Sequence, residues 1–172
     1  KVYNGAKIKL VPLKANGLQS IFYDFFTMLD ASIRRADHIL VLGVSGGFFF
    51  PLFRFFKSSI ILNPDGAEWK RSKFSSIVKR FLKLSEKLGV SHADKVISDS
   101  AVIADDIMAR YGVRSSIVEY GGDHVEALPL RSETIDFYDI RDREYAFKVC
   151  RIVPENNIEI IFLHAKEIIQ RL

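Results

Sequence analysis

The sequence contains very little cysteine: Cys150 is the only one among 172 residues. A disulfide within the chain is therefore excluded, and so is a cysteine-rich zinc site. The four histidines are scattered without the spacing of metal ligands, and we expect no metal. No apolar run approaches the roughly 18 residues that a membrane span needs. With 48% hydrophobic and 27% charged residues, the composition is instead that of a globular protein with a sizeable core.

Several common catalytic and phosphate-binding motifs are also missing. The turn Gly43-Val-Ser-Gly-Gly47 follows a predicted strand and precedes a predicted helix, so its backbone could approach a phosphate. It matches neither G-x-G-x-x-G nor the P-loop pattern. Ser45 lies in only part of the G-x-S-x-G pattern of hydrolases, and a hydrolase triad is unsupported. We keep Ser45 and Gly46 as candidates for substrate binding.

Short apolar runs alternate with longer helical patterns along most of the chain. We predict strands at residues 7–13, 38–43, 59–63, 95–98 and 116–120, and helices at 21–35, 48–56, 74–90 and 101–111. This alternation predicts an α/β fold, a Rossmann-like parallel sheet with helices on both faces. Ligands of such sheets bind beyond the carboxyl ends of the strands. We therefore look for a site in the loops at 43–47, 63–72, 98–100 and 120–124.

The positions of individual residues predict where these helices begin, end and bury their side chains. Ser20 and Ser100 are predicted N-caps, Pro51 suits the first turn of a helix, and Gly112 suits a helix end. Apolar spacing predicts the buried faces of two helices. The predicted faces comprise Phe22, Phe25, Phe26, Leu29 and Ile33 on the first, and Phe74, Ile77, Val78, Phe81, Leu84 and Leu88 on the other.

The character of the sequence changes after Asp123. Residues 124–144 are polar and carry charges of both signs, and we interpret them as a linker. A predicted strand at 145–150 and a predicted helix at 155–172 follow. We therefore expect a first domain at 1–123, which lacks its first strand, and the truncated start of a second domain at 145–172.

The net charge of +4 is unevenly distributed. Residues 70–95 hold eight basic and two acidic residues, a net charge of +6, which leaves −2 for the rest. One interpretation is a solvated helix face, and the other is contact with a membrane, a lipid diphosphate or a nucleic acid. The scarcity of aromatic residues after Trp69 disfavours nucleic acid. The predicted contact residues form a stripe on the helix at 74–90: Lys79, Arg80, Lys83 and Lys87.

Six of the fourteen phenylalanines lie between Phe48 and Phe56. Such a run is typical of a buried helix in an α/β fold. A membrane-dipping edge is the alternative interpretation.

The loop at 63–71, Asn-Pro-Asp-Gly-Ala-Glu-Trp-Lys-Arg, holds the densest group of polar residues. Its carboxylates suit a reacting centre, its tryptophan offers a flat face on which a sugar can stack, and its cations can bind phosphate or carboxylate. Ordinary turn formation, with a tryptophan that merely packs, is the alternative. We predict two catalytic candidates without assigned acid or base roles, Asp65 and Glu68, and four substrate-binding candidates, Gly66, Trp69, Lys70 and Arg71.

Several stretches of the sequence are distinctive together. They are residues 65–73 (Asp-Gly-Ala-Glu-Trp-Lys-Arg-Ser-Lys), 81–86 and 93–100, with 43–46, 120–123 and 151–157 in addition. In these stretches the chain resembles a bacterial glycosyltransferase family that includes rhamnosyltransferases of surface-polysaccharide synthesis. The resemblance implies the GT-B architecture, in which two Rossmann-like domains face each other across a cleft. The chain would be most of the acceptor-side N-terminal domain, joined to the first strand and helix of the donor-side domain.

The resemblance also implies roles for residues outside the 63–71 loop. Gly122 and Asp123 match a substrate-binding turn near the cleft, and Arg151 matches an arginine that binds the donor diphosphate. Asn157 stands where the family usually has a lysine, which is a departure from its pattern.

The activity implied is transfer of a sugar, with rhamnose as one candidate, from a nucleotide-sugar to a saccharide acceptor attached to a lipid. The donor is a substrate, and neither a cofactor nor a metal is expected. We expect a cytoplasmic enzyme, peripheral at the inner face of the cell membrane, that binds no nucleic acid. Because the donor half would be missing, the chain alone would be inactive. The alternatives are a nucleotide-sugar epimerase of the same architecture and a binding module that contacts an anionic partner through the basic helix.

Overall fold

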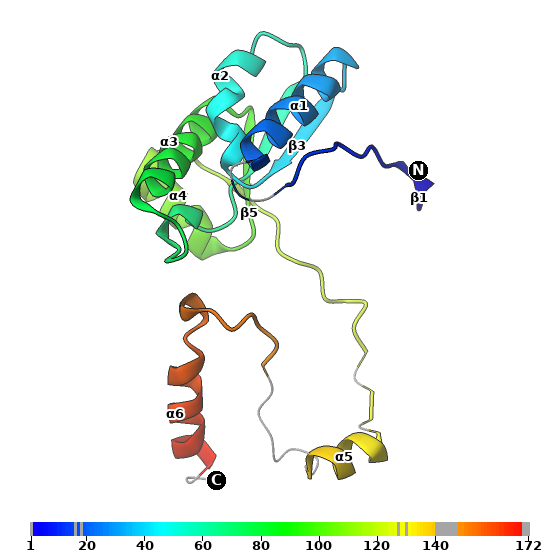
Figure 1. Cartoon of the computed structure of the whole chain (residues 1–172), viewed down its shortest axis with the longest axis vertical. Helices are drawn as coiled ribbons and strands as arrows, with labels where there is room; N and C mark the ends of the chain where they lie inside the picture. Colours follow the sequence, from blue (N-terminus) through cyan, green and yellow to red (C-terminus); the bar gives the residue numbers. More distant parts are fainter. Residues whose placement is uncertain are drawn as a thin grey trace. The chain divides into compact units, whose positions relative to one another are not determined.

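A four-stranded parallel sheet is the centre of the fold in the computed structural model (Figure 1). Its strands lie in chain order: β3 (His38–Leu42), β4 (Ser59–Asn63), β5 (Lys95–Ser98) and β6 (Ser116–Ile117). The register pairs His38 with Ser59 and Leu42 with Asn63. Helices flank this sheet, so the predicted α/β, Rossmann-like class is confirmed. The structure describes residues 2–15, 17, 19–126, 128–129, 131–139 and 148–169, which form two compact units, Lys1–Tyr120 and Gly121–Leu172.

Each strand of the sheet is followed or preceded by helical segments. They are α1 (Gln19–Ile33) before β3, η1 (Ser45–Phe49) and α2 (Phe50–Phe53) before β4, η2 (Glu68–Lys70) and α3 (Ser76–His92) before β5, and α4 (Ala101–Tyr111) before β6. Three predicted signals are confirmed. Pro51 lies in the first turn of α2, the Ser100 hydroxyl accepts a hydrogen bond from the Ile103 N–H, and Gly112 ends α4 with a φ of 68°. Ser20 lies inside α1 rather than at its cap.

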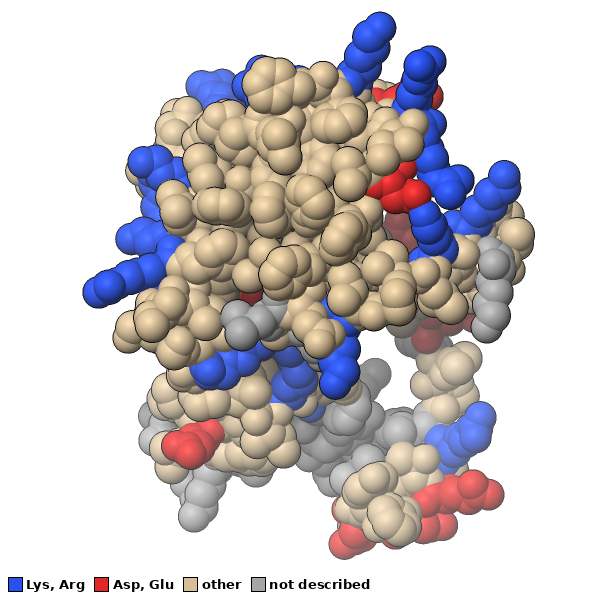
Figure 2. Space-filling model, turned by 45° about the horizontal axis from the view of Figure 1, so that its top comes forward, with Lys and Arg blue, Asp and Glu red and all other residues tan. Residues whose placement is uncertain are grey.

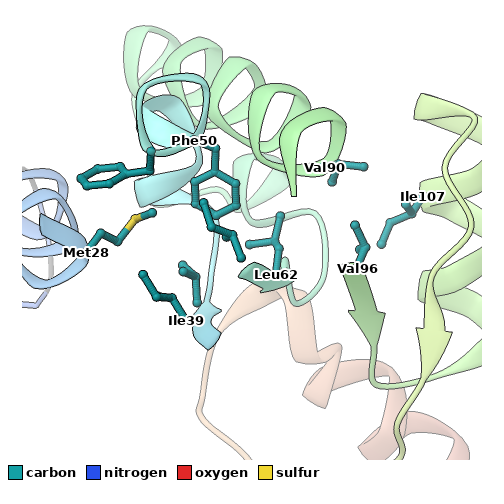
Figure 3. Close-up of a cluster of buried hydrophobic side chains, with 10 residues drawn as sticks. Met28, Ile39, Phe50, Leu62, Val90, Val96 and Ile107 are labelled. Carbon is teal, nitrogen blue, oxygen red and sulfur yellow. The ribbon is translucent and has the colours of Figure 1, made fainter. Parts of the chain in front are cut away.

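The core lies between the helices and one face of the sheet (Figure 3). Alternate strand residues are buried there, while Leu40 and Leu42 on the opposite face are 55% and 73% exposed. In the described residues of the first unit, the buried side chains gather on this face of the sheet. The buried cluster comprises Met28, Ile39, Val41, Phe50, Phe53, Ile60, Leu62, Val90, Val96 and Ile107.

The turn after β3 and helix α3 approach each other very closely. A Cβ atom at Gly47 would lie 2.4 Å from the carbonyl oxygen of Ser85 and 3.0 Å from the Cα of Gly89. The buried Ser85 hydroxyl donates to the Val44 carbonyl at 2.5 Å and accepts from the Phe48 N–H at 2.8 Å. Glycine at position 47 therefore lets α3 come close enough for Ser85 to hold the turn that follows β3 by hydrogen bonds.

The predicted strand at 7–13 is wrong over most of its length. Only β2 (Ala6–Lys7) is a strand, paired antiparallel with β1 (Val2–Tyr3). Residues 9–13 line a groove against α1 instead, and Lys9 forms an ion pair with Asp30. Their apolar side chains face a helix rather than a sheet. The predicted strand at 116–120 is also shorter, since β6 ends at Ile117.

The buried faces of α1 and α3 differ from those predicted by apolar spacing. On α1 the buried residues are Met28 and Ser32, whereas Phe22, Phe26 and Ile33 are exposed. On α3, Ile77 and Leu84 are exposed. The buried residues of α3 include small and polar ones as well as apolar ones: Leu82, Ser85, Glu86, Gly89 and Val90. The close contact with η1 and a buried ion pair require these residue types, which a count of apolar positions does not detect.

The second unit contains α5 (Ser132–Tyr138), η3 (Pro154–Asn156) and α6 (Ile158–Ile169). Helix α5 lies within the segment predicted as a linker. Of the predicted strand at 145–150, residues 145–147 lie outside the described residues and 148–150 form no strand. Among the helices that the structure describes, none is long and apolar enough to span a bilayer.

We predict that Gly47→Ala destabilises the protein by about 1–3 kcal/mol, because the added methyl group has to displace the α3 backbone. Urea-induced unfolding measures this change. Gly66→Ala is the matched control, since nothing lies within 4 Å of its added Cβ. Equal free energies of unfolding for the two variants would contradict the close packing of η1 on α3.

Candidate functional site

The carboxyl ends of β4 and β5 bring three polar side chains together. Asn63, the last residue of β4, donates from Nδ2 to Asp99 Oδ1 at 2.7 Å. The Tyr120 hydroxyl donates to the other carboxylate oxygen of Asp99 at 3.1 Å. Asp99 therefore connects the ends of two strands to the segment after β6. We call Asn63, Asp99 and Tyr120 the Asp99 network.

Asp65 lies beside the Asp99 network in an unusual backbone conformation. Its φ is 59°, in the left-handed region, and its N–H donates to Asn63 Oδ1 at 2.9 Å. The pKa of Tyr120 lies above its ordinary value, first because of the hydrogen bond to Asp99, and also because of the negative charges of Asp99 and Asp65. The exposed carboxyl group of Asp65 is thus held near two other polar groups of the site.

The loop continues from Asp65 into η2, which carries more of the predicted site residues. Glu68 Oε1 and Arg71 Nη1 lie 3.8 Å apart and form a partly exposed ion pair. The space around Gly66 is open within 4 Å of where its Cβ would lie. A single loop beyond the carboxyl end of β4 thus carries three of the predicted site residues, Asp65, Gly66 and Glu68.

Trp69 is surrounded by cationic side chains. Lys83 Nζ lies 4.8 Å, Lys70 Nζ 5.4 Å and Arg110 Cζ 5.8 Å from the centroid of its ring. Cation–π attraction to these groups fastens η2 to α3 and α4. The indole N–H is buried and has no hydrogen-bond partner among the described residues. This environment favours packing over sugar stacking as the role of Trp69.

Arg110 connects Trp69 to a buried carboxylate. Glu86 of α3 is 1% exposed, pairs with Arg110 Nη1, and accepts from the Tyr111 hydroxyl at 2.9 Å. Burial alone would lower the pKa of Arg110, but hydrogen bonds with Asp106 and Glu86 raise it above its ordinary value. Burial and the charge of Glu86 raise the pKa of Tyr111 to about 12. These contacts hold α3, α4 and the loop after β4 together.

The predicted substrate-binding turn after β3 packs against α1. The Ser45 hydroxyl donates to Asp24 Oδ2, and a Cβ at Gly46 would lie 3.0 Å from the Cβ of Asp24. Burial raises the pKa of Asp24, and the hydrogen bond from Ser45 offsets part of that rise. Gly43, with a φ of 101°, donates its N–H to the Asn63 carbonyl at 2.8 Å. The turn is therefore fixed at the same edge of the sheet as the Asp99 network.

Three predicted site residues belong to the second unit. The carbonyl of Gly122 accepts from the Val125 N–H at 2.9 Å, which closes a turn around the exposed Asp123. Arg151 is exposed, and its carbonyl accepts from Asn156 Nδ2 at 2.6 Å. Their substrate-binding and diphosphate-binding roles stay predictions.

The predicted basic stripe lies on α3. Arg80, Lys83 and Lys87 are exposed, and Lys79 is half-buried. Lys83 also contacts Trp69, so the stripe begins beside the loop after β4. In the described part of the chain, no group of three or more histidine, cysteine, aspartate and glutamate side chains is placed to hold a metal ion.

Sequence reasoning did not select Asp24, Asn63, Asp99 or Tyr120 as site residues. Asn63 and Asp99 had a usable signal, because each stands at the carboxyl end of a predicted strand, where ligands bind. Tyr120 had the same signal, since it ends the predicted strand at 116–120. Asp24 had none, because it lies in a predicted helix and contacts a residue 21 positions away along the chain.

One comparison with known proteins gives a match. Residues 16–123 match a family described as a domain of unknown function, DUF1972. No curated protein matches the chain. The matched residues extend over more than half of the chain and include the loop at 63–71 and the whole Asp99 network.

We predict that Asp99→Asn lowers the pKa of Tyr120 toward its ordinary value of about 10, because the charged acceptor of its hydroxyl is removed. NMR titration of tyrosines labelled at Cζ measures this pKa, and Tyr120→Phe identifies the resonance. The matched control is Asp105→Asn on α4, which leaves the network intact. An unchanged Tyr120 pKa in Asp99→Asn would contradict the hydrogen bond.

We predict that Arg110→Gln lowers the free energy of unfolding by about 3 kcal/mol, because it leaves Glu86 buried without a cationic partner. Adding Glu86→Gln to this variant should restore part of the loss. Arg80→Gln, at an exposed arginine of α3, is the control and should change stability by less than about 0.5 kcal/mol. Equal free energies of urea unfolding for the two arginine variants would contradict a stabilising role of the buried Glu86–Arg110 pair.

Proposed function

The chain belongs to the DUF1972 family, a domain of unknown function, and on that premise we propose that it is part of a glycosyltransferase. It is the acceptor-side domain of an enzyme that moves a sugar from a nucleotide-sugar to a saccharide acceptor in the synthesis of cell-surface polysaccharide. Rhamnose is one candidate sugar. In this proposal the donor is bound by a separate domain that includes the second unit.

The observation that carries this proposal is the cluster of polar side chains at the carboxyl edge of the sheet. Asp99 holds Asn63 and Tyr120, and Asp65 lies beside them with its backbone fixed by Asn63. Carboxylate, amide and phenol groups are hydrogen-bonding partners for sugar hydroxyls. Their place beyond the strand ends is where ligands of open parallel sheets bind.

Basic residues of the two units suit a substrate that carries a diphosphate. Lys70 and Arg71 follow Glu68 on the same loop, and Arg151 is the proposed diphosphate ligand of the second unit. In glycosyl transfer of this kind, much of the rate comes from positioning the acceptor and from stabilising the departing diphosphate. Asp65 and Glu68 are the catalytic candidates, and no metal or cofactor is part of the proposal.

The proposed place of action is the inner face of the cell membrane, on an acceptor attached to a lipid. The exposed cations of the α3 stripe support this, because each lysine or arginine near an anionic surface contributes about 1 kcal/mol of attraction. The contact is peripheral.

We predict that Asp65→Asn and Glu68→Gln each lower kcat/KM for sugar transfer at least about tenfold in the full-length protein, a loss of about 1.4 kcal/mol in the transition state. The assay uses a panel of radiolabelled nucleotide-sugars with lipid-linked and soluble saccharide acceptors. Asp105→Asn on α4 is the control with an intact site.

Full activity in both variants would contradict the assignment of these two residues. Conversion of a nucleotide-sugar without any acceptor would favour an epimerase instead. Turnover by residues 1–172 alone would contradict the division of the site between two domains.

A further inference from the structure

Large apolar side chains are exposed together on the outer surface of α1, η1 and α2. Phe22 and Phe26 lie one turn apart on α1, and Leu52 lies one turn beyond Phe48. The segment that follows α2 adds two more rings. We call these six residues the aromatic patch, with exposed fractions of 60% for Phe22, 50% for Phe26, 42% for Phe48, 51% for Leu52, 87% for Phe55 and 37% for Phe56.

Ring contacts link three rings of the patch, Phe26, Phe48 and Phe56, through the rings beneath them. These three rest on half-buried or buried rings, and each neighbouring pair has centroids 5.0–5.8 Å apart. One series runs from α1 through η1, and a branch of it reaches the segment after α2. The contacts in order are Phe26–Phe25, Phe25–Phe49 and Phe49–Phe48, with Phe25–Phe53 and Phe53–Phe56 as the branch.

The charged residues near the patch are mostly basic, with the exposed Asp37, which lines a groove with Phe55 and Phe56, as an acidic exception. No aspartate or glutamate occurs between residues 38 and 64, while Arg54 and Lys57 follow α2 and are exposed. On the other side of η1, α3 presents its basic stripe. Figure 2, which turns the α1–α2 end of Figure 1 toward the reader, shows a broad tan area with Lys and Arg side chains along both of its sides and a few acidic side chains among them on the right.

The acidic side chains of α1 and α3 are hydrogen-bonded, paired with cations or buried. Glu86 is the only acidic residue of α3, and it is 1% exposed and paired with Arg110. On α1, Asp24 accepts a hydrogen bond from Ser45, and Asp30 pairs with Lys9 and Arg34. The surface therefore combines exposed aromatic groups with a positive border.

We infer that this surface docks on an anionic lipid bilayer, with the aromatic patch inserted at the level of the headgroups and the basic residues around it bound to phosphates. Groups of exposed apolar side chains mark interaction sites, and phenylalanine and leucine beside lysine and arginine are typical of interfacial membrane contacts. A two-fold dimer through the same patch would bring the two basic borders against each other. Charge complementarity thus favours the bilayer over a second copy.

This inference rests on the membrane contact proposed above and is independent of the proposed sugar transfer. The inference assigns part of the affinity for the membrane to the aromatic patch rather than to the α3 stripe alone. Attraction between the α3 stripe and headgroups is screened by salt, whereas burial of apolar groups is not. Binding that survives high salt is therefore the sign of aromatic insertion.

The test is flotation of the protein with phosphatidylcholine vesicles that contain or lack phosphatidylglycerol, at low salt and at about 1 M salt. We expect binding to the anionic vesicles, with a measurable part that remains at high salt. Leu52→Ser and Phe55→Ser should each weaken the partition coefficient about tenfold. Val102→Ser on α4 is the matched control, an apolar residue 78% exposed outside the patch, and should bind as the parent does.

A second measurement does not depend on a destabilising change. Phe55→Trp places a fluorophore in the patch, and lipids brominated on their acyl chains should quench it on binding. The parent protein, whose only tryptophan is Trp69, gives the background signal.

Several results would overturn the inference. If the serine variants at Leu52 and Phe55 bound like the parent while Arg80→Gln and Lys83→Gln abolished binding, an electrostatic contact would remain and the patch would have no part in it. Absence of binding to every vesicle would remove both the patch inference and the membrane contact, but transfer to a soluble acceptor would still be testable separately. Self-association that Phe55→Ser abolishes, without lipid binding, would assign the patch to a second copy.

Discussion

The contact between the turn after β3 and helix α3 is the constraint on which the first unit depends. Gly47 lies so close to Ser85 and Gly89 that no side chain fits between them. The same approach lets Ser85 hold the ends of the turn through Val44 and Phe48. Helix α3 also carries Glu86, which pairs with Arg110, and Arg110 in turn contacts Trp69. The placement of this one helix therefore fixes the loops after both β3 and β4.

The same arrangement separates the two surfaces to which we assign function. The carboxyl edge of the sheet carries the Asp99 network and Asp65, where polar groups are held by hydrogen bonds to one another. The outer side of α1, η1 and α2 carries the aromatic patch, whose rings rest on the buried Phe53 and the half-buried Phe25 and Phe49. A substrate attached to a lipid would need both kinds of surface on one protein, one for its sugar and one for the bilayer.

The sequence predicts this structure best in the three central strands. The strands at 38–42, 59–63 and 95–98 each have an apolar centre, and their carboxyl ends lead into the loops that carry Asn63, Asp65 and Asp99. The exposure of the phenylalanine rings on α1 and the short length of β6 were not predicted. Apolar spacing within one segment does not show which other segments of the chain pack against it. Hydrogen bonds such as Tyr120–Asp99 join residues that only the folded sheet brings together.

The most direct test of the account is an NMR titration of the ¹⁵N-labelled chain with a water-soluble, short-chain prenyl diphosphate sugar. If the carboxyl edge of the sheet receives the acceptor, chemical shifts should change mainly at residues 43–47, 63–71, 98–100 and Tyr120. Shift changes confined to the amino ends of the strands, near residues 33–38 and 55–59, would contradict the account.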